Sequence, residues 1–108
     1  GVRRALRPGG RFAFSAFSAY FQVANLEERD RFDAASGVNH ERTEIRSEVG
    51  GSTEADLWTT CYTPRELRLL VERAGLEVTD IHSANTGTYR PLDPSITTPE
   101  FLVLGCRP

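Results

Sequence analysis

Two stretches of the chain are apolar without alternation, and both predict strands covered on two faces. Residues 12–17 read Phe-Ala-Phe-Ser-Ala-Phe, and residues 101–106 read Phe-Leu-Val-Leu-Gly-Cys. Such runs are typical of strands that lie inside an α/β sheet, between layers of helix. A third strand is predicted over residues 76–83, where apolar and polar positions are mixed.

The clearest helical pattern covers residues 64–74. Thr63 is its predicted N-cap, Pro64 suits the first position, and Glu66 completes a Thr-x-x-Glu capping box. Gly75 supplies the left-handed residue that ends such a helix. The predicted apolar face consists of residues at helical spacing, namely Leu67, Leu70, Val71 and Ala74.

The remaining segments carry weaker patterns. Helical spacing at the N-terminus stops at Pro8 and the Gly9-Gly10 pair, and a short helix is predicted around residues 20–24. Residues 27–33 are charged and are interpreted as a solvated surface stretch. Residues 85–99 contain Gly and three Pro and are expected to form a long loop.

Residues 19–60 are interpreted as an insertion that carries a β-hairpin over about 40–60. Gly50-Gly51 separates two extended, charged arms, and a primed turn requires residues that accept positive φ. Because neither arm alternates cleanly, we expect an exposed hairpin that lies over another part of the molecule.

The order of the elements predicts one mixed α/β sheet. A strand, helix, strand unit implies a right-handed crossover, so strands 10–17 and 76–83 should run parallel. The last strand, 100–107, follows without a helix and is expected to be antiparallel.

Composition limits the classes of function. The chain has 108 residues and a net charge of −2, which gives no general attraction to nucleic acid or to anionic membranes. No apolar run reaches the roughly 20 residues of a membrane span, and no secretory pattern is present, so a cytoplasmic location is expected. Cys61 and Cys106 are predicted to be buried thiols. Together with His40 and His82 they lack the spacing of a zinc site, so no metal is expected.

Three segments resemble class I S-adenosylmethionine-dependent methyltransferases. The stretch LRPGGRFAFSAF (6–17) resembles the entry into the fifth strand of that family. The stretch YTPRELRLLVERAGLEVTDIHS (62–83) is similar to the following helix and sixth strand. The stretch PEFLVLGCRP (99–108) is similar to the seventh, antiparallel strand, and the three occur in the family's order.

The resemblance implies a partial Rossmann-like sheet with the strand order 10–17, 100–107, 76–83. Residues 1–108 would be a C-terminal subdomain, and the N-terminal half that binds the cofactor would lie outside this chain. No Gly-x-Gly-x-Gly is present, and Gly9-Gly10 precedes a strand instead of following one. The resemblance therefore implies S-adenosylmethionine as cofactor of the whole protein, with no cofactor-binding or catalytic residue assigned here.

The implied function is methyl transfer to a small-molecule acceptor by the whole protein, with this part inactive alone. Ligands of such sheets bind beyond the carboxyl ends of the parallel strands. The residues that follow these ends, or that the hairpin could bring over them as a lid, are candidates for acceptor binding: Ser18, Tyr20, Phe21, His40, Trp58, Tyr89 and Arg90. For each aromatic the alternative is hydrophobic packing; for His40 it is an ordinary surface position, although a general base is conceivable.

A second hypothesis is a stand-alone, non-catalytic interaction or dimerisation module. In the implied strand order, residues 12–17 form an edge although their composition is that of a central strand. Bare apolar edges recruit other chains, so self-association through this strand is predicted. The two hypotheses differ in whether a cofactor-binding half belongs to the same protein.

Overall fold

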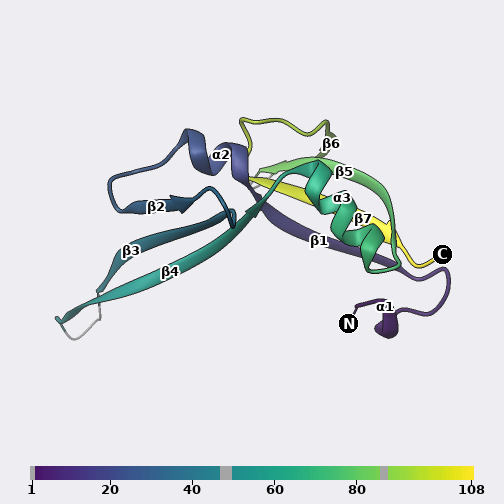
Figure 1. Ribbon diagram of the computed structural model, residues 1–108, viewed down its shortest axis with the longest axis horizontal. Coiled ribbons are helices and arrows are strands. Elements are labelled where there is room, and N and C mark those ends of the chain that lie inside the picture. The colour runs from purple at the N-terminus through teal and green to yellow at the C-terminus, as the bar shows by residue number, and fades with distance from the viewer. Residues whose placement is uncertain (1, 47–49, 86–87) are drawn as a thin grey trace.

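The computed structural model describes residues 2–46, 50–85 and 88–108, with the side chains at 45, 46, 85 and 88–90 left aside. These residues contain three helices: α1 (Val2–Ala5), α2 (Ala19–Ala24) and α3 (Pro64–Arg73). The strands are β1 (Arg11–Ser18), β2 (Asp30–Asp33), β3 (Val38–Arg46), β4 (Ser52–Tyr62), β5 (Glu77–Asn85), β6 (Thr88–Leu92) and β7 (Glu100–Cys106). Figure 1 shows their arrangement.

The strands form one sheet in the order β2-β3-β4-β1-β7-β5-β6. Strand β7 pairs antiparallel with β1 on one side and with β5 on the other. Strands β1 and β5 therefore point the same way, which confirms both the predicted strand order and the antiparallel last strand. The predicted hairpin is also confirmed, because β3 and β4 pair antiparallel from Val38 opposite Thr60 to Arg46 opposite Ser52.

Helix α3 forms because its ends are specified locally. The Thr63 hydroxyl accepts a hydrogen bond from the Glu66 backbone N–H at 3.2 Å, and the Glu66 carboxylate accepts one from the Thr63 N–H at 3.3 Å. Gly75 follows the helix with φ at +80°. The capping box and the left-handed C-terminal residue are thus confirmed.

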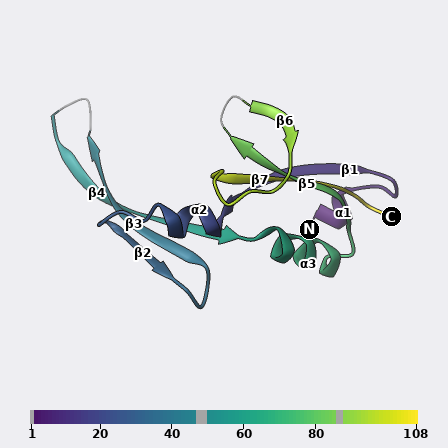
Figure 2. The ribbon, with the colours of Figure 1, turned by 90° about the horizontal axis from the view of Figure 1, so that it is seen from above.

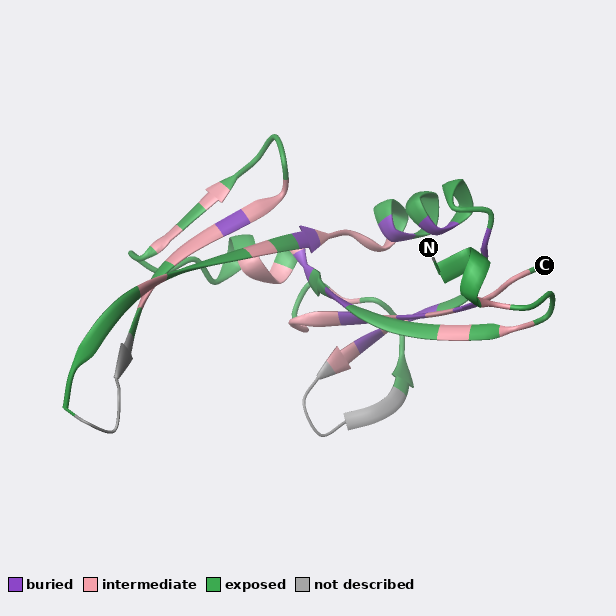
Figure 3. Ribbon diagram, turned by 90° about the horizontal axis from the view of Figure 1, so that it is seen from below, coloured by how far each residue is buried: buried purple, intermediate pink, exposed green. Residues whose placement is uncertain are grey.

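The core lies between α3 and one face of β1, β7 and β5. Phe101 and Val103 at the centre of β7 are fully buried. The residues that pack around them are Ala16, Leu67, Val71, Leu76 and Ile81. Helices α1 and α3 lie on the same side of this part of the sheet (Figure 2), and the buried positions gather there (Figure 3).

The prediction that β1 is covered on both faces is wrong for this structure. Phe14 and Phe17 are 39% and 50% exposed. Strand β4 pairs with β1 only at Phe17 and Ser18, so within the described residues the outer edge of 11–16 has no partner strand. The strand is exposed because both helices of this part lie on one face.

The same arrangement corrects two further predictions. On α3, Leu67 and Val71 are buried, whereas Leu70 and the C-cap residue Ala74 are exposed and line a hollow beside Phe14 of β1. Cys61 is buried and Cys106 is only partly buried, although both thiols were expected in the interior. Cys106 alternates with the buried Gly105 along β7, so its side chain lies on the sheet face opposite α3.

Two segments expected to be irregular contain strands. Residues 30–33 form β2, which pairs with β3, and residues 88–92 form β6, which pairs with β5. In both cases a neighbouring strand satisfies the backbone hydrogen bonds, and the local sequence carries no signal of that partner.

The hairpin extends the sheet beyond the carboxyl end of β1 and projects away from α3, instead of folding back as a lid (Figure 1). The molecule measures 51 × 31 × 29 Å, and its radius of gyration is 16.6 Å. A compact domain of this length has a radius of gyration of about 13 Å. Among the described residues, no helix is both long and apolar enough to cross a membrane.

Candidate functional site

Ser18, at the carboxyl end of β1, has a structural role. Its side chain is 1% exposed and accepts a hydrogen bond from the Phe21 N–H at 3.2 Å, which caps α2. Its own backbone N–H donates to the Pro99 carbonyl at 2.9 Å. Ser18 therefore positions α2 at the end of the sheet, and its hydroxyl is buried.

Helix α2 carries the next two predicted residues in different surroundings. Tyr20 is exposed, whereas Phe21 is half-buried and lines a small polar hollow with Asn25 and Arg29. Charged side chains lie at the base of the hairpin here. Arg29 forms an ion pair with Glu27 at 3.0 Å. That bond raises the pKa of the Arg29 guanidinium.

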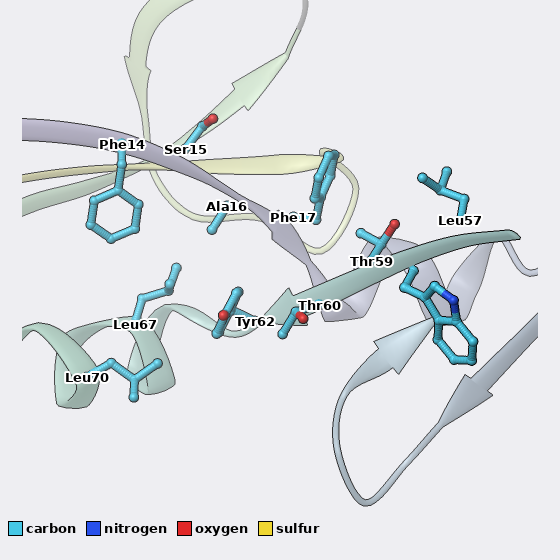
Figure 4. A pocket seen from close by; sticks show the side chains of 11 residues that line it. Phe14, Ser15, Ala16, Phe17, Leu57, Thr59, Thr60, Tyr62, Leu67 and Leu70 are labelled. Carbon is cyan, nitrogen blue, oxygen red and sulfur yellow. The ribbon is translucent and has the colours of Figure 1, made fainter. Parts of the chain in front are cut away.

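An apolar groove of about 590 Å³ lies where β1 and β4 diverge (Figure 4). Phe14 and Phe17 on β1 line one side, and Leu57 on β4 lines the other. Below them, Leu67 and Leu70 of α3 form the floor. The two strands meet at Phe17 opposite Cys61, so the groove closes at the carboxyl end of β1.

His40 and Trp58, both predicted from the sequence, are brought together on the hairpin. They are a cross-strand pair of β3 and β4, and their rings stack with centroids 4.0 Å apart and planes at 8°. The His40 Nε2 atom lies 2.8 Å from a carboxylate oxygen of Asp56, the residue two positions before Trp58. The imidazole is thus held by a stacked ring and a carboxylate at once.

Trp58 connects this cluster with the groove. It is 66% exposed and is one of the residues that line the groove. It also lines a second hollow of about 620 Å³, together with His40, Phe32 and Arg31. The hollow and the groove therefore adjoin each other at Trp58, beyond the end of β1.

Sequence reasoning missed Asp56 and the apolar groove residues. Asp56 and Trp58 are two positions apart on a strand, so they share a face. That spacing would have pointed to Asp56 once the hairpin register was known. The predicted Tyr89 and Arg90 fall in β6, and their side chains lie outside the described residues.

The described residues contain neither a metal-binding cluster nor a glycine turn with free N–H groups at residues 9–10. Among the described residues, no three His, Cys, Asp or Glu side chains are placed to hold a metal ion. The N–H of Gly9 donates to Arg107 at 2.8 Å and that of Gly10 to Arg7 at 2.8 Å. Since this turn uses both of its N–H groups within the fold, it does not fit a cofactor cradle.

No protein-family model matches the sequence, and no curated protein matches it. Two solved structures are similar in fold. The CcbJ methyltransferase from Streptomyces caelestis matches 98% of this chain and 50% of its own, with 19% identity and a TM-score of 0.72. A S-adenosylmethionine-dependent methyltransferase from Clostridium acetobutylicum ATCC 824 matches 98% and 48%, with 17% identity and a TM-score of 0.67.

The chain has the fold of part of a methyltransferase domain. It spans about half the length of the solved methyltransferases that it matches. This similarity confirms the fold that the sequence motifs predicted. At 19% and 17% identity it is evidence of a shared fold and not of a shared activity. The groove and the His40 cluster lie at the end of the sheet where an open α/β fold binds its ligands.

Proposed function

We propose that the 108 residues are the C-terminal part of a S-adenosylmethionine-dependent methyltransferase that acts on a small-molecule acceptor. The observation that carries this proposal is the alignment of nearly the whole chain with half of two methyltransferases. The sequence motifs of residues 6–17, 62–83 and 99–108 support it independently. In this proposal the chain supplies part of the acceptor site and one end of the sheet.

The remainder of the protein would bind the methyl donor. The Gly9-Gly10 turn is used within the fold, which is consistent with a cofactor cradle outside this chain. The open edge of β1 and the apolar groove beside it offer a surface on which an N-terminal half would pack. The large radius of gyration also agrees with half of a domain.

Binding of S-adenosylhomocysteine tests the proposal. We expect isothermal titration calorimetry to show binding to the full-length protein and no heat of binding to residues 1–108 alone. Circular dichroism of the 108-residue chain serves as the control for folding. Clear micromolar binding to the isolated chain would contradict the assignment of the donor site to the other half.

A stand-alone interaction module is the second candidate, because the apolar outer edge of β1 over 11–16 has no partner strand in the part of the chain that the structure describes. The same titration separates the two candidates. A full-length protein that binds no S-adenosylhomocysteine and transfers no methyl group would favour the interaction module over the enzyme.

A further inference from the structure

We propose that His40 accepts a proton from the nucleophilic group of the methyl acceptor, with Asp56 and Trp58 as positioning residues. This inference rests on the proposed function and assigns one step to the hairpin. The acceptor would carry a hydroxyl or ammonium group. The covalent O–H or N–H bond of the methyl acceptor breaks, and an N–H bond forms at Nδ1 of His40. The electron pair of the broken bond stays on the oxygen or nitrogen of the acceptor.

The first argument is the orientation of the imidazole. Its Nε2 atom lies 2.8 Å from the Asp56 carboxylate, which can only accept, so Nε2 carries the proton in the neutral ring. The lone pair is then on Nδ1. A carboxylate in this position fixes the tautomer of a histidine base and stabilises the imidazolium that forms.

The second argument is restraint. The Trp58 ring stacks on His40 at 4.0 Å with nearly parallel planes, so the imidazole is held on its face as well as at Nε2. These two contacts limit the rotamers that His40 can adopt, and such a restriction costs conformational entropy. The arrangement is that of an oriented base and differs from a freely rotating surface histidine.

The third argument is position. His40 lines the hollow of about 620 Å³, which has room for part of a small molecule. Trp58 lies three residues before Cys61, where β4 meets the carboxyl end of β1. Three residues of strand span about 10 Å. The hollow is therefore close to the end of the sheet at which an α/β fold binds its ligands.

The charges around the imidazole come from three strands. Strand β2 contributes Arg31, which pairs with His40, and Asp33, which lines the hollow. Strand β3 contributes Arg42, two residues along the same face, and β4 contributes Asp56. Arg42 is itself paired with Glu54 of β4 at 3.2 Å, so the charged groups near the imidazole are of both signs.

Activity of the full-length protein tests the proton transfer. Radiolabelled S-adenosylmethionine is combined with a panel of phenols and primary amines, and the methylated products are measured between pH 5 and pH 9. We expect His40→Gln to lower kcat/KM at neutral pH by about 100-fold and to remove the acid limb of the pH profile. Asp56→Asn should also lower kcat/KM at neutral pH, and it should shift the acid limb of the pH profile.

Glu72→Gln is the control, because Glu72 is an exposed carboxylate on α3, from which the hairpin projects away. It should leave the rate and the pH profile unchanged. Imidazole added to the His40→Ala variant should restore part of the activity. An unchanged pH profile in His40→Gln overturns the inference alone, whereas a wild-type protein that methylates none of the panel counts against the proposed function as well.

A measurement without turnover tests the geometry. The ¹⁵N chemical shifts of the His40 ring, in histidine-labelled full-length protein, should place the proton on Nε2 at neutral pH. The Asp56→Asn variant should lose that preference. A proton on Nδ1 in the wild-type protein overturns the inference whatever the activity of the variants.

Discussion

At the scale of single residues, the candidates differ in what already occupies their polar atoms. Ser18 follows β1 directly, yet its hydroxyl caps α2 and is buried. His40 is far along the chain from β1, yet its ring is oriented by Asp56 and Trp58 beside an open hollow. Proximity to the end of a strand is thus a weaker guide to chemistry than the partners of each polar atom.

Asp30 shows how single hydrogen bonds stabilise the base of the hairpin. Its carboxylate accepts hydrogen bonds from the Glu27 backbone N–H at 2.9 Å and from the Asn39 side-chain amide at 3.0 Å. These bonds lower the pKa of Asp30. The carboxylate therefore stabilises the folded state above its unfolded pKa of about 3.9, and this contribution is lost as the pH falls through the lower folded value.

We predict that Asp30→Asn reduces the stability of the protein at pH 7 by about 1 kcal/mol. It should also flatten the fall in stability between about pH 4 and pH 2. Thermal unfolding followed at several pH values measures both effects. Asp93→Asn is the control, because Asp93 is exposed beyond β6. An acid limb of wild-type size in Asp30→Asn would contradict the assignment.

At the scale of elements, β7 is the strand that joins the two halves of the core. It lies between β1 and β5, and three of its side-chain positions face α3. At the third of these, Gly105, an added Cβ would lie 2.5 Å from the Glu77 carbonyl oxygen and would overlap the Phe12 ring. A glycine is required here by the close approach of a neighbouring strand.

We predict that Gly105→Ala destabilises the protein by about 1–3 kcal/mol, since a backbone carbonyl cannot move aside without disturbing the pairing of β5 and β7. Denaturant unfolding measures the change. Gly51→Ala is the matched control, because a Cβ at Gly51 would meet no atom within 4 Å. Equal unfolding midpoints for the two variants would show that the sheet adapts to the methyl group.

At the scale of the whole molecule, two strand edges of the sheet differ in how well they resist pairing with another chain. Strand β2 on the outer edge reads Asp-Arg-Phe-Asp, and such charges discourage edge pairing. Strand β1 is apolar, and its outer edge over 11–16 is unpaired within the described residues. We propose that this edge makes the isolated chain self-associate when the rest of the protein is absent.

We predict that residues 1–108 form dimers or larger species in multi-angle light scattering as their concentration rises. Ser15→Lys should shift the profile toward monomer, because Ser15 is exposed on β1 and a lysine there disfavours pairing with a second copy. Thr53→Lys adds the same charge on the distant hairpin and should have no effect. A wild-type chain that stays monomeric at high concentration would contradict the prediction.

The elements with local signals were predictable from the sequence. The capping box of Thr63 and Glu66, the left-handed Gly75 and the two apolar runs each depend on neighbours within a few residues. The order of β1, β7 and β5 in the sheet was predicted from the resemblance to class I methyltransferases and is confirmed. Strand β2 was not predictable, because its hydrogen bonds depend on β3.

Sequence by itself determined that this chain folds as an α/β unit with a hairpin inserted after its first strand, because capping, turn and burial patterns are short-range. Only the tertiary structure decided that His40, Asp56 and Trp58 meet, because cross-strand register joins residues up to 18 positions apart. Only the tertiary structure also decided that the side chains of Phe14 and Phe17 on β1 are exposed. An apolar strand is buried when other elements pack on it, and its own residues cannot specify whether they do.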